Sequence, residues 1–164
     1  ASPMVLTGVI NKSDFFRSID WEVYFLLSGL IPMGMAIEKS GTASYIAAKI
    51  LNLSNVLPAI SIAMIVYLAT SVMATVVGNN ASALLMLPIA IGTAQQLGVN
   101  PFSFVLITTF AASAAFASPV GYQTNLMVYS SGGFKFKDFI IAGTPLQVLL
   151  AIVVPLLVRM FWGF

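Results

Sequence analysis

Hydrophobic residues in this chain form long uninterrupted runs rather than the mixed pattern of a soluble domain. From Ile50 to Phe134 there is no Asp, Glu, Lys or Arg, whereas one membrane-spanning helix needs only about 20 apolar residues. Several membrane segments are therefore expected inside this run, and the chain is predicted to be an all-α polytopic membrane protein.

The part of the chain before this run predicts one further crossing. Residues 21–37 are apolar apart from Glu22, and Trp21 and Tyr24 suit the aromatic belt of a membrane interface. Upstream, residues 4–10 have the pattern of the end of an apolar helix and lack the charged region that opens a signal peptide. The chain is therefore expected to begin inside a transmembrane helix, with a polar connection over residues 11–20.

Residues 40–55 have a different pattern. Apolar residues recur at roughly helical spacing between Tyr45 and Leu53, and Lys39 and Lys49 are placed to reach water. The segment is too short to cross a bilayer, so we predict a helix that lies along the membrane interface. A plain helical connector is the alternative.

Residues 56–97 are long enough for two helices, and their centre, Gly78-Asn79-Asn80, is polar but uncharged. A loop that emerges into water usually carries a charge, and irregular backbone inside a bilayer must be buried in protein or face a wet cavity. We therefore predict a re-entrant helical hairpin with Gly78-Asn79-Asn80 at its tip. Two complete crossings joined by an uncharged loop are the alternative, and both return the chain to the same side.

Residues 101–131 predict a single crossing that is interrupted halfway. A helix is expected over residues 101–117, with a surface of small side chains that lets neighbouring helices approach closely. Pro119 and Gly121 then break the helical pattern within residues 118–125. A continuous helix with a proline kink is the alternative. After a short turn over residues 134–138, a last transmembrane helix is predicted over residues 139–160.

Composition narrows the function. Only 7% of the residues are charged and the net charge is +2, which does not indicate a nucleic-acid surface. There is no Cys and no His, so thiolate and imidazole metal ligands and the commonest general base are absent. A nucleophile at Ser82 or Ser118 would have no evident base, and an intramembrane enzyme is not expected. The basic residues divide four to three between the two predicted sides, which is too even to set the orientation.

The predicted hairpin tip and helix break are two irregular, uncharged elements at similar depth. Half-helix N-termini bind anions, and half-helix C-termini and unwound carbonyls coordinate small cations. No carboxylate lies in this region to relay protons, so the pattern indicates Na⁺ and an anion in one site. Side-chain oxygens or amide donors are offered by Asn79, Asn80, Ser82, Tyr122, Thr124 and Asn125. The alternative is that each of these side chains only bonds neighbouring helices together.

Several motifs occur in order along the chain: GNNASALLMLPI at 78–89, FASPVGYQTNLMVY at 116–129, GGFKFKDF at 132–139 and GTPL at 143–146. Together they resemble the C-terminal inverted repeat of the divalent anion/sodium symporter family. The similarity covers essentially the whole chain and is greatest to the sulfate-permease-like branch that often carries TrkA-C domains.

This resemblance implies an elevator-type transporter of two inverted repeats, each with a re-entrant hairpin and a broken helix. Residues 1–55 would belong to the scaffold and residues 56–164 to the moving transport part. The implied substrate-binding residues are Asn79, Asn80, Tyr122 and Thr124. The implied Na⁺ ligands are Val77, Asn79, Gly121 and Gln123, and the implied support of the helix break comes from Gly78, Ser118, Pro119 and Asn125.

Departures from the family pattern qualify the substrate. The family's Ser-Asn-Thr tip becomes Gly78-Asn79-Asn80, and Tyr122 replaces a substrate-contacting Thr of dicarboxylate carriers, so sulfate is favoured and a dicarboxylate stays possible. Only one repeat is found, so the chain is expected to hold half a site, as a truncated sequence, a split transporter with a partner chain, or an antiparallel homodimer. The family implies a homodimer in the cell (inner) membrane. The alternative function is a non-transporting membrane subunit or channel-like scaffold.

Overall fold

The computed structural model describes residues 21–54 and 57–164, and this part of the chain is entirely helical and irregular, with no strand. The predicted helix end over residues 4–10 and the connection over 11–20 lie outside the described residues. The helices are α3 (Trp21–Lys39), α4 (Thr42–Ser54), α5 (Ala59–Val77), α6 (Asn79–Leu97), α7 (Pro101–Ala112), α8 (Gln123–Ser131) and α9 (Phe136–Trp162). The prediction of an all-α chain is confirmed for the described residues.

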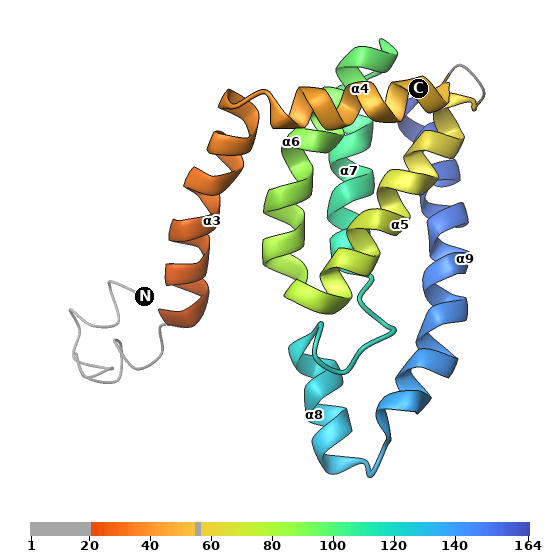
Figure 1. Cartoon of the computed structure of the whole chain (residues 1–164). Coiled ribbons are helices and arrows are strands. Elements are labelled where there is room, and N and C mark those ends of the chain that lie inside the picture. The colour runs from red at the N-terminus through yellow and green to blue at the C-terminus, as the bar shows by residue number, and fades with distance from the viewer. Residues whose placement is uncertain (1–20, 55–56) are drawn as a thin grey trace, which may run out of the picture.

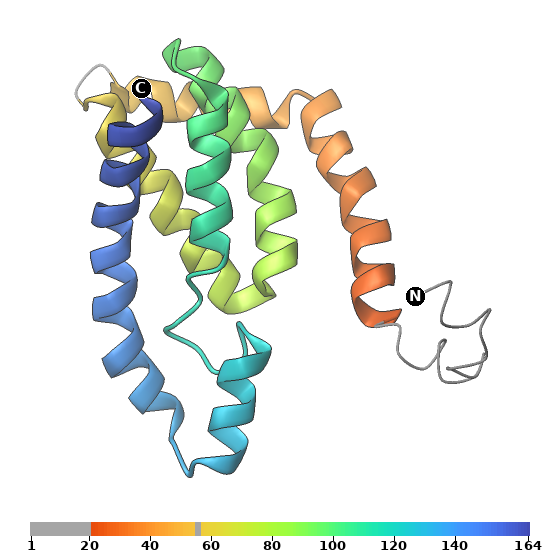
Figure 2. The same cartoon turned by 180° about the vertical axis from the view of Figure 1, so that it is seen from behind.

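Helices α5, α6, α7 and α9 run side by side, and α3 packs against α6 at one side of this group (Figure 1). Helix α4 lies across one end of the group, roughly perpendicular to the other helices, and the same arrangement is seen from behind (Figure 2). The placement of α4 along a membrane interface stays a prediction.

The core lies between α5, α6, α7 and α9 and is rich in alanine. Each of these helices contributes at least one buried Ala, including Ala63, Ala90, Ala111 and Ala151, around the larger Phe104. Because small side chains let helix backbones approach closely, this composition suits helices that associate without much hydrophobic driving force. Helix α7 is packed against α5, α6 and α9, as the small-residue surface predicts.

Helices α5 and α6 are antiparallel and are joined by Gly78 alone (Figure 1). Gly78 has φ 86° and ψ 165°, a backbone region that is essentially restricted to glycine. The predicted tip residues are therefore the turn between these two helices, with Asn79 as the first residue of α6.

The helix predicted over residues 101–117 is five residues shorter than expected, because α7 ends at Ala112. Residues 113–122 are non-helical and α8 begins at Gln123, so this part of the chain is two helices rather than one kinked helix. Side chains from elsewhere replace the lost helical hydrogen bonds: Ser71 Oγ donates to Ala114 O at 2.8 Å, and Asn125 Nδ2 donates to Ala115 O at 2.9 Å. Such tertiary bonds are invisible to a local sequence pattern.

Helix α9 is longer than predicted, starting at Phe136 instead of residue 139 and ending at Trp162. The charged residues assigned to the preceding turn form the first turn of the helix, where the Asp138 carboxylate accepts a hydrogen bond from the Lys135 N–H at 2.8 Å. An acidic side chain at this position satisfies a free backbone donor and complements the helix dipole.

Among the described residues, two helices are long and apolar enough to cross a membrane, α5 and α9. Only 39% of the most apolar stretch of α5 and 22% of that of α9 is buried within the chain. Most of the apolar surface of these two helices therefore faces outward. The helix predicted over residues 21–37 is present as α3, but α3 is not among the helices that are long and apolar enough. Its membrane crossing stays a prediction.

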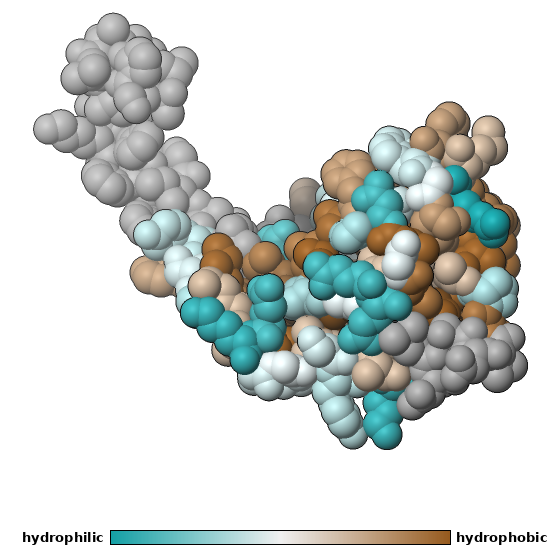
Figure 3. Space-filling model, turned by 90° about the horizontal axis from the view of Figure 1, so that it is seen from above, coloured by the Kyte–Doolittle hydropathy of each residue, from teal (hydrophilic) through white to brown (hydrophobic). Residues whose placement is uncertain are grey.

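Hydrophilic side chains gather over the end of the molecule where α4 lies, with hydrophobic surface around the rim (Figure 3). The exposed polar residues of α4, of the end of α3 and of the connection from α6 to α7 include Lys39, Lys49, Gln96 and Asn100. Lys135 and Asp138 lie at the opposite end of α9 from Arg159. Among the described residues, charge is thus confined to the two ends of the helix group.

Candidate functional site

The side-chain amide of Asn79 lies between two backbone carbonyls, one from the last residue of α7 and one from the non-helical segment 113–122. With its nitrogen turned inward, Nδ2 donates to Ala112 O at 3.0 Å and to Gly121 O at 3.1 Å. The tip of the α5–α6 pair is therefore joined directly to the last residue of α7 and to the approach to α8. The two polar elements that the sequence predicts at similar depth meet here.

A half-turn about the Cβ–Cγ bond of Asn79 exchanges its amide nitrogen and oxygen, which have nearly the same shape. With the oxygen turned inward, Asn79 Oδ1, Ala112 O and Gly121 O converge, and they repel one another unless a cation lies among them. Three neutral oxygens are a donor set of the kind that Na⁺ accepts, so the residues present fit a small cation.

Close packing holds Gly121 in this site. A Cβ atom at Gly121 would lie 3.0 Å from Ala74 O, from Thr75 Cα and from Ala115 Cβ, so a side chain would press against α5. Pro119 is fully buried, and Ser118 Oγ accepts a hydrogen bond from the Val120 N–H at 3.1 Å. These contacts fix the backbone that carries the Gly121 carbonyl.

Four helix ends converge on the same region. The C-terminal ends of α5 and α7 bring partly negative carbonyls, and the N-terminal ends of α6 and α8 bring partly positive N–H groups. Neither Gly78 before α6 nor Tyr122 before α8 caps its helix through a side chain. By contrast, Asn100 caps α7 by accepting from the Phe102 N–H.

Asn125, in the first turn of α8, anchors this helix to the non-helical segment. Its Nδ2 donates to Ala115 O at 2.9 Å and to Ser118 O at 3.1 Å. Helix α8 has no buried side chain among those described, so these two bonds are its main polar attachment. The role of Ser118, Pro119 and Asn125 as support of a broken transmembrane helix stays a prediction.

Four of the remaining predicted site residues have exposed side chains near this centre. Asn80 and Thr124 lie in the first turns of α6 and α8, Tyr122 is 50% exposed, and Val77 is the last residue of α5. Gln123 is the first residue of α8, and its side chain is outside the described set. The roles of all five residues stay predictions.

Sequence reasoning missed the carbonyl of Ala112, because the predicted helix ran past it. It also missed Ser71 and Gln147, which are buried and linked to each other and to Ala114 O. The available signal was that each is a polar residue at the centre of an apolar helix. Gly143 was predicted only as part of a motif, yet a Cβ atom at this position would overlap the Phe116 carbonyl oxygen.

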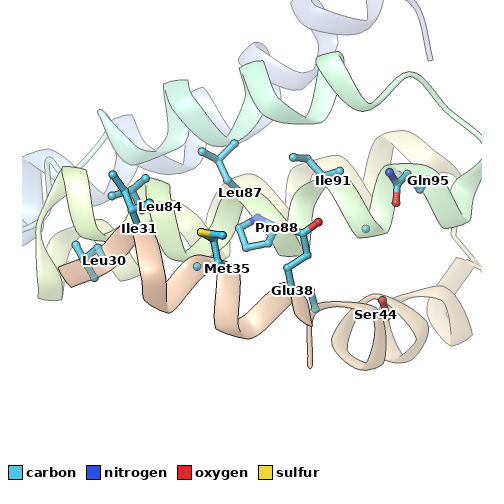
Figure 4. A pocket seen from close by; sticks show the side chains of 13 residues that line it. Leu30, Ile31, Met35, Glu38, Ser44, Leu84, Leu87, Pro88, Ile91 and Gln95 are labelled. Atoms are coloured by element: carbon cyan, nitrogen blue, oxygen red, sulfur yellow. The ribbon is translucent and has the colours of Figure 1, made fainter. Parts of the chain in front are cut away.

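A separate groove of about 350 Å³ lies between α3, α4 and α6. Its walls are mainly apolar, with Glu38, Ser44 and Gln95 toward one end (Figure 4). It involves α6 only from Leu84 onward and does not include the Asn79 site. Within the described residues no cluster of Asp and Glu is suited to bind a metal.

A family model described as "Citrate transporter" (CitMHS) matches residues 1–109. The chain belongs to this citrate transporter family. The relationship to anion transporters predicted from the motifs is confirmed, and the family is one of membrane transporters rather than enzymes.

The chain is also similar, over nearly its whole length, to several longer transporters. It is 45% identical over 160 residues to an uncharacterized transporter of Synechocystis sp., covering 98% of this chain and 26% of that protein. It is 34% identical over 154 residues to sodium/sulfate cotransporter 1 of Chlamydomonas reinhardtii, covering 93% and 18%. It is 28% identical over 155 residues to an uncharacterized transporter of Escherichia coli, covering 94% and 25%. The chain thus spans 18% to 26% of the length of these relatives.

Proposed function

We propose that this chain carries the C-terminal half of the binding site of a secondary transporter. This transporter would couple the inward movement of Na⁺ to the uptake of a small divalent anion. The observation that carries the proposal is the placement of the Asn79 amide between the carbonyls of Ala112 and Gly121. A polar cluster of this kind in an uncharged, apolar setting suits a cation that is bound and released without a fixed counter-charge.

Na⁺ would be held by Asn79 Oδ1 with the carbonyls of Ala112 and Gly121, and the carbonyls of Val77 and Gln123 would complete its shell. When bound, the ion supplies a positive charge next to the anion site. The chain's own contribution is to fix the carbonyls: Gly121 by packing against α5, and segment 113–122 by its hydrogen bonds.

The anion would lie at the N-terminal ends of α6 and α8. Both ends present free first-turn N–H groups, which favour negative charge. Asn80 and Thr124 add side-chain donors in these same turns, and Tyr122 lies directly before α8. Because no basic side chain of the described residues belongs to these turns, the bound cation would provide the main charge complement.

The length of α9 on either side of the site supports a position inside the membrane. Gly143 and Gln147 of α9 lie against segment 113–122 and α5, so about two turns of α9, roughly 10 Å, extend beyond this level to the charged residues 135–138. The α5–α6 pair enters from the end marked by α4 and turns at Gly78 part-way along α9 (Figure 1). This geometry supports a re-entrant hairpin and a broken transmembrane helix.

The proposed site is half of a complete one. We propose that a second, inverted repeat supplies the other half, that α3 and α4 belong to the scaffold, and that residues 56–164 move as the transport part of an elevator. Family analogy adds a homodimer in the cell membrane. The long outward-facing apolar surfaces of α5 and α9 suit contacts with lipid and with the rest of such a transporter.

Sulfate is the preferred substrate. The motif changes at Gly78, Asn80 and Tyr122 argue against a dicarboxylate, and a relative at 34% identity is described as a sodium/sulfate cotransporter. The family description names citrate, so citrate is the competitor that needs testing beside sulfate.

The experiment is uptake of radiolabelled sulfate into proteoliposomes that contain the complete transporter. An inward Na⁺ gradient should drive accumulation, an equal K⁺ gradient should not, and unlabelled sulfate should compete better than citrate or succinate. Uptake that is unchanged when Na⁺ is replaced by K⁺ would refute the coupling.

The inward-nitrogen arrangement of Asn79 supports one alternative. Two good hydrogen bonds to Ala112 O and Gly121 O satisfy the amide without an ion, as in a membrane subunit whose polar residues only hold helices together. Such a subunit would not transport and would keep this site dry.

A further inference from the structure

A buried chain of hydrogen bonds runs from α9 through α5 to the non-helical segment. Gln147 Nε2 donates to Ser71 Oγ at 2.5 Å, and Ser71 Oγ donates to Ala114 O at 2.8 Å. The exposed fractions of Gln147, Ser71 and Ala114 are 4%, 0% and 3%. Three elements that are distant in the sequence are therefore joined by polar groups inside the core.

We call this chain of hydrogen bonds the Gln147–Ser71 relay. It lowers the stability of the fold unless every polar group in it is bonded, because an unpaired polar group in a low-dielectric interior carries a large desolvation penalty. The neighbours of Gln147 along α9 are mostly Leu, Ile and Val, so a polar residue at this position interrupts an apolar helix. Helix packing alone therefore gives no reason for a Gln–Ser pair at this place, whereas the Ala114 carbonyl does.

Ala114 lies two residues after Ala112, whose carbonyl faces Asn79, and one residue before Ala115, whose carbonyl is held by Asn125. The first part of segment 113–122 is thus held on one side by the Gln147–Ser71 relay. The N-terminal end of α8 is held separately, by Asn125. The relay reaches the cation half of the proposed site and not the helix N-termini of the anion half.

We propose that Gln147 and Ser71 are positioning residues that set the Ala112 carbonyl for cation binding, so that α9 controls Na⁺ affinity without touching the ion. This inference rests on the proposed Na⁺-coupled transport. It assigns to the last helix a role in the coupling-ion site, to which the helix contributes no ligand.

The relay is tested by Gln147→Leu and Ser71→Ala in the complete transporter in proteoliposomes. We expect the Na⁺ concentration for half-maximal sulfate uptake to rise about tenfold in each variant, as for the loss of one buried hydrogen bond. The KM for sulfate at saturating Na⁺ should stay within about twofold. The double variant should be little worse than either single one, because both break the same chain.

Thr70→Val is the matched control. Thr70 neighbours Ser71 on α5, is equally buried, and spends its hydroxyl on the carbonyl of Val66 in its own helix at 2.7 Å. This substitution should leave the half-maximal Na⁺ concentration unchanged. If Gln147→Leu does not reach the membrane, Ser71→Ala, which removes a single oxygen, decides the question.

One result would refute the proposed role of the relay. Wild-type uptake would depend on Na⁺, but Ser71→Ala would have the same half-maximal Na⁺ concentration as Thr70→Val. An equal rise in the sulfate KM at saturating Na⁺ would also overturn it, because that result indicates general damage. Wild-type uptake that does not depend on Na⁺ would instead refute the proposed function, and the relay with it.

Discussion

At the scale of single residues, the site depends on places where the backbone of segment 113–122 meets a neighbour without room for a side chain. Gly121 fits against α5, and Gly143 of α9 fits against Phe116 O. Gly29 of α3, in contrast, has no atom within 4 Å of a Cβ position. The three glycines form a graded series.

The series predicts the cost of adding one methyl group. Gly143→Ala should destabilise the complete transporter by about 1–3 kcal/mol or more, because its Cβ would overlap a backbone carbonyl. Gly121→Ala should cost less, because shifts of a few tenths of an ångström relieve its contacts. Gly29→Ala should be neutral or slightly stabilising, since Ala favours helix. Thermal denaturation in detergent measures the order, and an equal loss in all three would contradict it.

The residues that were predicted from the sequence are those with unusual chemistry at an irregular position. Asn79, Gly121 and Asn125 stand out as polar or flexible residues between apolar helices, and the structure brings them together. The Ala112 carbonyl, Ser71 and Gln147 were not predicted, because a backbone oxygen has no sequence signature and a lone Ser or Gln in a helix is ambiguous. The hydrogen bonds of Ser71 and Gln147 join residues that are 43 and 76 positions apart in the sequence.

At the scale of elements, the turn at Gly78 needs glycine because of its backbone conformation and not because of crowding. Nothing lies within 4 Å of a Cβ at this position, yet φ is +86°. Gly78→Ala should therefore cost about 1–3 kcal/mol through strain alone and should move Asn79 at the start of α6. The measurement is the thermal midpoint of the complete transporter together with its sulfate uptake. Unchanged values for both would show that the turn adopts another conformation.

Helix α8 offers an independent test of the attachment by Asn125. Asn125→Ala removes both bonds to the carbonyls of Ala115 and Ser118, so amide hydrogen exchange should accelerate in residues 113–131. Exchange in α7 should change little. Thr109→Ala, which removes only a bond to the carbonyl of Val105 in its own helix, is the control. No acceleration relative to this control would show that packing, and not Asn125, holds α8.

Element boundaries show where local pattern and tertiary structure diverge. Helix periodicity placed α3, α4, α5 and α6 nearly at their observed positions, because each is bounded by glycine, proline or charge. The end of α7 was misplaced by five residues because its carbonyls find partners on α5 and α8, and the start of α9 was misplaced because a charged turn was not recognised as a capped helix.

At the scale of the whole molecule, the proposed function puts the site inside the membrane and requires a water path to it. Charge at both ends of the described helices, with apolar surface between them, suits this position. Cysteines at Asn80 and Thr124, in a background without other cysteines, should react with membrane-impermeant thiol reagents. A cysteine at Lys137 should react as a water-exposed control, and one at Leu157, on the exposed apolar face of α9, should not. Protection of both site cysteines would favour the non-transporting alternative.

The central claim is that a cation binds among Asn79, Ala112 and Gly121, and Na⁺-dependent thermal stabilisation of the purified complete transporter tests it directly. Without anion, Na⁺ should raise the midpoint of the wild type with saturation, because a ligand that binds the folded state stabilises it. Asn79→Asp keeps the oxygen and should keep this Na⁺ response, whereas Asn79→Ala should lose it. A Na⁺ response in Asn79→Ala equal to that of the wild type would contradict the account.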